Sequence, residues 1–223
     1  MILYILSLDK HLDWVELSKY LHFVSYERCK KIEKYVDVGR KIISVLTELL
    51  LRFSLIKNFD LEQKKIKFRY NKYGKPMILN KKNLHFSISH SNSTISVLIN
   101  DSPVGLDVEF CRKVNFNIAK RFFTIDEYKT ILSNKDPNKM FFKIWTQKEA
   151  HIKLLGINFS KLLKTPKQKI DSEIFYHCFD FQSHIISIAC LNAKTKIKIK
   201  YISLIEILSV FKIDEGLFPN LNL

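Results

Sequence analysis

The stretch SPVGLDVEF, residues 102–110, carries two carboxylates inside a segment that otherwise has the pattern of a hydrophobic strand. Side chains alternate between the two faces of an extended chain, so Asp107 and Glu109 would point the same way, with Cα atoms about 6.5–7 Å apart. Two carboxylates at that separation can chelate one cation. The alternative is an exposed edge strand with ordinary polar alternation.

A third carboxylate comes from the segment NKMFFKIWTQKEAHIKLLG, residues 138–156, whose apolar residues recur at helical spacing. Glu149 would lie beside the apolar face of this helix. A carboxylate near a core costs several kcal/mol unless it is neutralised, paired or bound to a metal. Lys153, four residues later, is one possible ion-pair partner. The other possibility is that Asp107, Glu109 and Glu149 converge on Mg²⁺, which binds few protein carboxylates together with substrate phosphate oxygens.

Outward from this strand, helices and short strands are interleaved without a regular βαβ period, which indicates an α+β fold. The pattern restarts near residue 103, so we expect two α+β halves, residues 1–103 and 104–223. Asp136 as N-cap, Pro137 at the first position and Gly156 after the last bracket the second long helix. The expected strands are residues 2–8, 84–90, 94–100, 104–110, 184–190 and part of 194–204, and the expected helices are 25–35, 40–56, 116–134 and 137–155.

Composition excludes several classes of protein. The 223 residues are 47% hydrophobic, which is enough for a substantial core. No apolar run reaches the roughly 18 residues of a membrane span, and the first residues lack the features of a signal peptide. Five glycines form no phosphate-binding loop, and four scattered cysteines favour reduced thiols in a cytoplasmic protein. The net charge of +15 reflects either compositional drift or acidic partners.

Five motifs resemble, in order and spacing, the 4'-phosphopantetheinyl transferases of the surfactin synthetase activator (Sfp) type. The likeness covers residues 4–160, and it is specific because GLDVE is followed about 40 residues later by WTQKEAHIK. The resemblance implies two similar α+β halves related by a pseudo-two-fold, with coenzyme A in the cleft between them. It also implies Mg²⁺-dependent transfer of phosphopantetheine from coenzyme A to a carrier-protein serine, releasing adenosine 3',5'-bisphosphate. The motifs are YGKP (73–76), FSISHS (86–91), VGLDVEF (104–110), KRFFTIDEY (120–128) and IWTQKEAHIKLLG (144–156).

The resemblance assigns the metal site to Asp107, Glu109 and Glu149, facing the pyrophosphate of coenzyme A. Glu149, or a water that it orients, would take the proton of the attacking serine. Lys153 would offer a cation to the same pyrophosphate. Glu127 also matches a catalytic position near the metal, but it has a structural explanation, because it could form a capping box with Thr124.

Coenzyme A binding is implied for a further set of side chains. Ser89 and His90 match positions at the 3'-phosphate, although a histidine at a strand end is usually a surface or turn residue. Lys75 lies in a turn whose Gly and Pro fix its exit angle, and the alternative is a solvated turn lysine. The complete implied set is Arg28, Lys31, Arg40, Lys75, Ser89, His90, Asp107 and Lys153.

The implied partner is an acidic acyl or peptidyl carrier protein, which a basic enzyme would attract electrostatically. The segment CRKVNFNIAKRFF, residues 111–123, mixes cations with phenylalanines and is our expected docking surface. Its alternative is an amphipathic helix with core phenylalanines. Two rival functions remain: a nucleic-acid-binding module suggested by charge alone, and a coenzyme A-binding relative without transferase activity. We expect a monomer, because one chain supplies both sides of the cleft.

Overall fold

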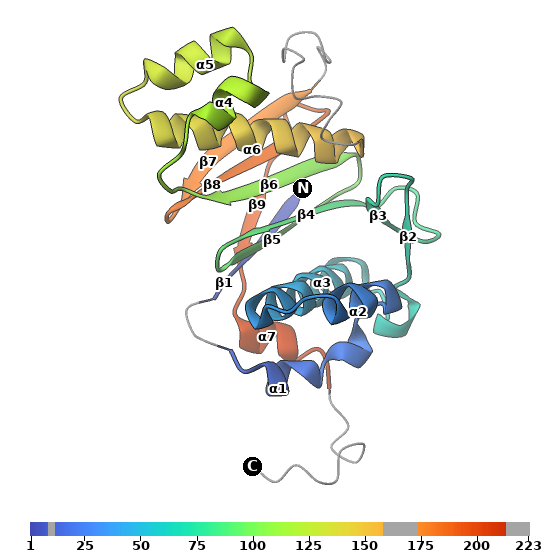
Figure 1. The fold of residues 1–223 in the computed structure, drawn as a ribbon. Coiled ribbons are helices and arrows are strands. Elements are labelled where there is room, and N and C mark those ends of the chain that lie inside the picture. Colours follow the sequence, from blue (N-terminus) through green and yellow to red (C-terminus); the bar gives the residue numbers. More distant parts are fainter. Residues whose placement is uncertain (9–11, 158–173, 213–223) are drawn as a thin grey trace.

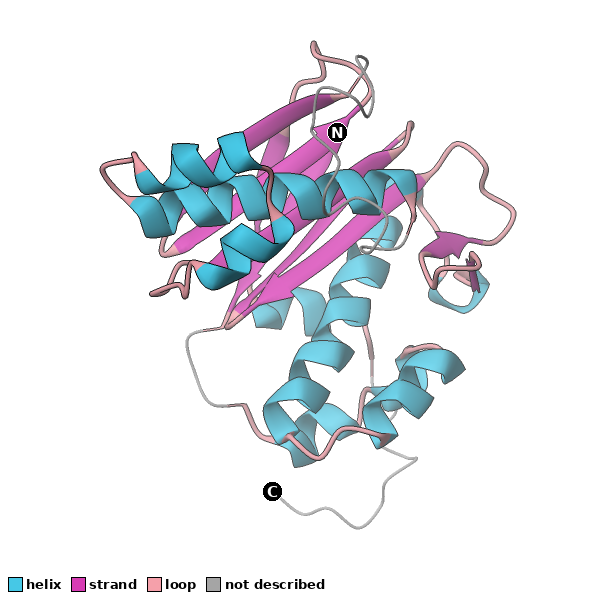
Figure 2. Cartoon of the chain, turned by 45° about the horizontal axis from the view of Figure 1, so that its top comes forward, coloured by secondary structure: helices cyan, strands magenta, loops and turns pink. Residues whose placement is uncertain are grey.

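The structure, a computed structural model, describes residues 1–8, 12–157 and 174–212. Two β-sheets lie at its centre, and each is covered by one long helix (Figure 1). Figure 2 shows the helices in two groups on opposite sides of the strands. The arrangement confirms the expected α+β class. Among the described residues, no helix combines the length and the apolar character that a membrane span needs.

The first sheet has four strands in the order β4-β5-β1-β9. β1 (Ile2–Ser7) runs antiparallel to β5 (Thr94–Asn100) and parallel to β9 (Lys198–Tyr201), and β4 (His85–Ser91) is antiparallel to β5. The long helix α3 (Val38–Phe59), expected over residues 40–56, packs on this sheet through apolar residues that include Leu46, Leu49 and Leu50. Around α3 lie α1 (Trp14–Ser18), α2 (Tyr26–Glu33), α7 (Leu204–Leu208) and the short 3-10 helices η1 (Leu21–Phe23) and η2 (Gln63–Lys65).

The second sheet has the order β6-β8-β7, with β6 (Val104–Phe110), β8 (His184–Cys190) and β7 (Phe175–Phe181) all antiparallel to their neighbours. The helix α6 (Pro137–Leu155) covers it, and α4 (Asn117–Phe122) and α5 (Ile125–Leu132) lie beyond α6 (Figure 1). A separate small hairpin is formed by β2 (Phe68–Tyr70) and β3 (Pro76–Ile78).

Helix α6 begins and ends where the sequence predicted. The Asp136 side chain accepts a hydrogen bond from the amide of Lys139, and Gly156 ends the helix in a left-handed conformation with φ 63°. The expected helix 116–134 is instead two helices. The break occurs at Thr124, where the Thr124–Glu127 capping box starts α5 in a new direction.

The chain returns to the first sheet at its end. β9 pairs with β1, and Ile207 and Phe211 are buried in the core around α3. The first sheet is therefore built from both ends of the sequence. The proposed division into residues 1–103 and 104–223 stays a prediction. β9 and α7 belong to the second range in sequence but pack with the first sheet.

The two sheets meet along β4 and β6, which run parallel to each other. Three serine hydroxyls of β4 accept hydrogen bonds from three backbone N–H groups of β6 at 2.9–3.2 Å: Ser87 from Leu106, Ser89 from Val108 and Ser91 from Phe110. We call this set of contacts the serine seam. The seam joins the two halves through serine side chains rather than through a continuous ladder of backbone hydrogen bonds. Because β6 lies against β4, it is not the exposed edge strand considered as an alternative.

Candidate active site

A cavity of about 550 Å³ lies between the two halves, lined by Asp107 and Glu109 of β6 and by Glu149 and Lys153 of α6. The Lys153 ammonium lies 2.8 Å from Asp107 Oδ1. Asp107 is 5% exposed, and its second oxygen, Oδ2, is buried without a hydrogen-bond partner among the described residues. The structure therefore brings the three predicted carboxylates and Lys153 to one cavity.

Close approach of α6 to β6 depends on Gly105. A Cβ atom at this position would lie 1.8 Å from the backbone oxygen of Ala150 and 2.6 Å from the amide nitrogen of Leu154. Both obstructing atoms belong to the backbone, so a side chain could fit only if the helix moved. The glycine thus sets the distance between the carboxylates on the strand and Glu149 on the helix.

The carboxylates disfavour one another's ionisation. Burial raises the pKa of Glu149 to about 7, and the nearby charges of Asp107 and Glu109 add to the effect, while Lys153 opposes it. Burial also raises the pKa of Glu109, followed by the charge of Asp107. A site that resists its own negative charge in this way favours a bound cation.

The donor set suits a hard divalent cation, because all three side chains offer carboxylate oxygens and Asp107 Oδ2 has no other partner. Within residues 1–8, 12–157 and 174–212, no three His, Cys, Asp or Glu side chains are close enough, as placed, to ligate one ion. Lys153 supplies the positive charge next to Asp107 in this structure.

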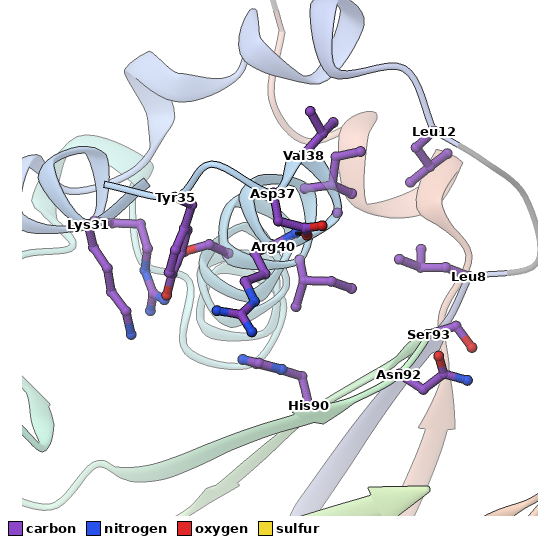
Figure 3. Close-up of a pocket in the computed structure, with 15 residues that line it drawn as sticks. Leu8, Leu12, Lys31, Tyr35, Asp37, Val38, Arg40, His90, Asn92 and Ser93 are labelled. Atoms are coloured by element: carbon purple, nitrogen blue, oxygen red, sulfur yellow. Dashed lines mark hydrogen bonds between the residues drawn. The ribbon is translucent and has the colours of Figure 1, made fainter. Parts of the chain in front are cut away.

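A larger cavity, about 970 Å³, adjoins the first and shares Arg28, Lys31 and His90 with it. Arg40, at the start of α3, also lines it, and Figure 3 shows His90 pointing from β4 toward Arg40. The predicted basic residues of α2 and α3 thus gather around one end of a continuous cleft. Apolar side chains line the rest of this cavity, among them Leu8, Leu12, Val38, Ile42 and Ile43.

Arg28 is held in place by Glu48, a carboxylate that sequence reasoning missed. Glu48 is 1% exposed, and its Oε2 accepts hydrogen bonds from Arg28 Nε at 3.3 Å and from the Ser25 hydroxyl at 2.8 Å. Ser25 is the N-cap of α2, but its side chain binds Glu48 rather than the helix amides. The sequence around Glu48, inside a long apolar helix, gave no sign of this role.

His90 is uncharged at neutral pH. Its ring is exposed to the cavity, and partial desolvation by the surrounding protein lowers its pKa to about 4, assisted by the charges of Lys153, Lys31 and Arg28. The same cations that disfavour an imidazolium favour an anionic ligand. A phosphate group among them would offset their charge and raise the pKa of His90.

Lys75 is engaged differently from the expectation. Its ammonium donates to the backbone carbonyls of Lys153 and Leu154, the latter at 3.2 Å, at the C-terminal end of α6. Burial lowers the pKa of Lys75 to about 8. The side chain lines a third cavity of about 230 Å³, which shares Lys153 with the carboxylate cavity.

Asn71, which the sequence analysis did not single out, holds the same turn. Its Oδ1 accepts from the amides of Tyr73 and Lys75, both at 2.9 Å, and its Nδ2 donates to the carbonyl of Gly156 at 2.9 Å. The β2–β3 hairpin is therefore fastened to the end of α6 by two side chains. An Asn two residues before Tyr-Gly predicts a turn, but not its partner.

Glu127 does not line the carboxylate cavity. It completes the capping box with Thr124, and its Oε2 lies 2.9 Å from the ammonium of Lys148, which is almost fully buried. The capping explanation of Glu127 thus has a geometric basis, and Lys148 is the ion-pair partner of Glu127.

The ring of Trp145 stacks on Phe141 with centroids 5.8 Å apart, in the apolar layer between α6 and the short helices.

The chain is similar to known proteins of one family. A sequence model described as the 4'-phosphopantetheinyl transferase superfamily matches residues 103–201. The chain is 32% identical over 156 residues to 4'-phosphopantetheinyl transferase ffp of Bacillus subtilis, covering 69% of this chain and 70% of that one. It is 30% identical over 157 residues to Sfp of Bacillus subtilis strain 168, with the same coverage. Against gsp of Aneurinibacillus migulanus the identity is 37% over 135 residues, 60% of this chain and 56% of the relative.

Proposed function

The chain belongs to the 4'-phosphopantetheinyl transferase superfamily, enzymes that transfer phosphopantetheine from coenzyme A to carrier proteins, and we propose that it performs this transfer in the three connected cavities. The observation that carries the proposal is the continuity of the cleft. A cationic end with Arg28, Lys31 and Arg40 leads directly to a carboxylate end with Asp107 and Glu149. Coenzyme A has the matching order of groups, with a phosphorylated nucleotide at one end and a pyrophosphate in the middle.

In this assignment the 3'-phosphate of coenzyme A lies among Arg28, Lys31, Arg40 and His90. The support is the gathering of Arg28, Lys31, Arg40 and His90 along one cavity. Arg28 keeps its orientation through Glu48 when a ligand binds. The apolar wall of the same cavity suits the adenine base.

Asp107, Glu109 and Glu149 would hold Mg²⁺ against the pyrophosphate, together with phosphate oxygens. When bound, the ion would neutralise the charge that develops on the bridging and leaving oxygens. Lys153 contributes an ammonium to the same oxygens from the neighbouring position on α6. Lys75 lies beside Lys153 and would contact coenzyme A from there. Its ammonium already binds the backbone carbonyls of Lys153 and Leu154.

In the transfer step, the carrier serine oxygen would attack the phosphorus that bears pantetheine. A new P–O bond forms, and the bond to the bridging oxygen breaks with its electron pair left on adenosine 3',5'-bisphosphate. Glu149, directly or through a water that it orients, would take the serine proton, because it lies in the same cavity as the proposed cation site. Glu127, paired with Lys148, would support the α5–α6 contact rather than the chemistry.

The carrier would approach over α4 and α5. The expected docking segment 111–123 contributes exposed cations, Lys120 and Arg121, but Phe123 is buried and Phe122 packs against Trp145. Ile118 of α4 and Ile125 and Leu132 of α5 are exposed apolar side chains. Helices that expose both apolar side chains and cations suit an acidic helix that has one apolar face.

One chain contributes residues from both halves to the cleft, which supports a functional monomer. Cys29, Cys111, Cys178 and Cys190 are all free thiols, which supports a reducing, cytoplasmic location.

Intact-mass analysis of several apo carrier proteins tests the function. Incubation with this protein, coenzyme A and Mg²⁺ should add one phosphopantetheine to at least one carrier. A carrier lacking the acceptor serine and a reaction containing a chelator should show no addition. Unchanged masses for acyl, polyketide and peptidyl carriers alike would refute the transferase proposal.

A further inference from the structure

We propose that Ser91 is a positioning residue that fixes the direction of the Glu109 carboxylate; the inference rests on the proposed cation site. Ser91 is the last residue of β4, and Glu109 lies across the serine seam on β6. The Ser91 hydroxyl accepts a hydrogen bond from the amide of Phe110 at 3.0 Å and donates one to Glu109 Oε2 at 2.9 Å.

The direction of both hydrogen bonds follows from the chemistry of the partners. A backbone N–H can only donate, and an ionised carboxylate can only accept. The hydroxyl between them must therefore receive from Phe110 and give its single hydrogen to Glu109. A hydroxyl held at both ends cannot rotate freely, so it defines where Glu109 Oε2 lies.

The same arrangement occurs two residues earlier in both strands. The Ser89 hydroxyl accepts from the amide of Val108 at 3.2 Å and donates to Asp107 Oδ1 at 2.8 Å. Because strand geometry repeats every two residues, the two serines hold Asp107 and Glu109 in equivalent orientations. The seam thus aligns the two strand carboxylates of the proposed cation site.

Glu109 has little else to fix it. Among the described residues, the cation that pairs with Glu109 is Arg112. Its guanidinium lies 3.8 Å from Glu109 Oε2, and its side chain is 62% exposed. An exposed ion pair at that distance contributes little and leaves the carboxylate free to move. Asp107, in contrast, also contacts Lys153 at 2.8 Å. Loss of the serine hydroxyl would therefore affect Glu109 more than the equivalent loss would affect Asp107.

Ser87 supplies a matched control within the same seam. Its hydroxyl accepts from the amide of Leu106 at 2.9 Å, as the other two serines do from their amides. The β6 residue beside it is Gly105, which has no carboxylate to receive the hydroxyl hydrogen. Ser87→Ala removes a seam contact without touching the carboxylates, and Ser91→Ala removes a seam contact together with the Glu109 partner.

Direct binding of Mn²⁺, followed by electron paramagnetic resonance, separates the two roles without relying on turnover. In the presence of coenzyme A, Ser91→Ala should weaken Mn²⁺ binding about 10-fold, the usual size of an outer-shell effect on metal affinity. Ser87→Ala should change the affinity less than about 3-fold, and Ser91→Thr, which keeps the hydroxyl, should restore binding to within about 3-fold of the parent. Carrier modification should show the same order when Mg²⁺ is limiting and converge as Mg²⁺ is raised.

Two results would overturn the inference: equal Mn²⁺ affinity in Ser91→Ala and Ser87→Ala, or a Thr variant as weak as the Ala variant. If Ser91→Ala does not fold, Ser91→Cys keeps the shape with a much weaker donor and should show the same loss of affinity. Failure of the unaltered protein to bind Mn²⁺ or to modify any carrier would instead count against the proposed function.

Discussion

The ammonium of Lys153 lies 2.8 Å from Asp107 Oδ1 and donates to the Ser89 hydroxyl at 2.9 Å, so one side chain of α6 contacts both strands of the serine seam. Its backbone carbonyl is in turn held by the ammonium of Lys75 from the β2–β3 hairpin. The β2–β3 hairpin, β4 and β6, all distant from α6 in the sequence, therefore meet at Lys153. Asp107 Oδ1 already accepts hydrogen bonds from Ser89 and Lys153. A ligand that enters the cavity must therefore either displace the Lys153 ammonium from Asp107 or bind to that ammonium itself.

Lys153→Ala should lower kcat for carrier modification by about 10²-fold, because the variant loses a fixed cation at the developing phosphate charge. The exposed lysine of α3, Lys57, is the matched control, and Lys57→Ala should retain kcat. Steady-state kinetics at saturating coenzyme A checks both variants. Equal kcat in the two would show that Lys153 has only a structural role.

Glu149→Gln should stabilise the metal-free protein increasingly as pH rises from 5 to 8. The folded-state pKa of about 7 lies above the ordinary value of 4.5, so the folded protein binds the extra proton and loses stability as that proton leaves. The difference in unfolding free energy between variant and parent should grow by about 2–3 kcal/mol across this range. Urea denaturation with a chelator at both pH values measures it. A pH-independent difference would mean that Glu149 is an ordinary solvated carboxylate.

His90→Ala should weaken coenzyme A binding about 10-fold or more, the cost of losing a hydrogen bond to a charged group. It should leave affinity for dephospho-coenzyme A, which lacks the 3'-phosphate, nearly unchanged. Because the pKa of His90 is about 4 without ligand, the parent protein should also take up a proton when coenzyme A binds near pH 5.5. Calorimetry in buffers of different ionisation enthalpy detects that uptake. Similar proton uptake with both ligands would place the phosphate elsewhere.

Asn71→Asp should lower turnover while leaving the hairpin turn intact, because aspartate keeps the acceptor for the amides of Tyr73 and Lys75 but loses the donor to Gly156. The expected loss of unfolding free energy is about 1 kcal/mol. Asn192→Ala is the control, since Asn192 makes a comparable local turn with Lys194. Thermal unfolding and kcat together check the result. Unchanged turnover in Asn71→Asp would separate the hairpin contact from catalysis.

Ile125→Asp should raise the KM for the carrier protein without changing the KM for coenzyme A. Ile125 is 73% exposed at the first position of α5, where an aspartate favours the helix, so folding should be unaffected. Ile205→Asp on α7, with Ile205 80% exposed, is the control on a distant helix. The parent's carrier KM should also increase with salt. Equal effects of the two substitutions would exclude α5 as the docking face.

Local signals predicted the elements well and their partners poorly. Helix α6 could be bounded from Asp136, Pro137 and Gly156 because capping depends on neighbouring residues alone. The three carboxylates could be grouped because a recognisable motif carries them. Lys75 and Glu127 were placed by motif near the ligand and the metal, and both have other contacts, because a side chain's partner depends on segments up to 79 positions away.

The parallel pairing of β1 with β9 has a consequence for the order in which the chain acquires structure. β1 is synthesised long before β9, so its neighbour on that side is complete only when Tyr201 has emerged from the ribosome. The β6–β8 pair is complete by Cys190 and can form earlier. The edge of β1 therefore stays unpaired until after β8 is made, and Ile207 and Phe211 join the core around α3 later still.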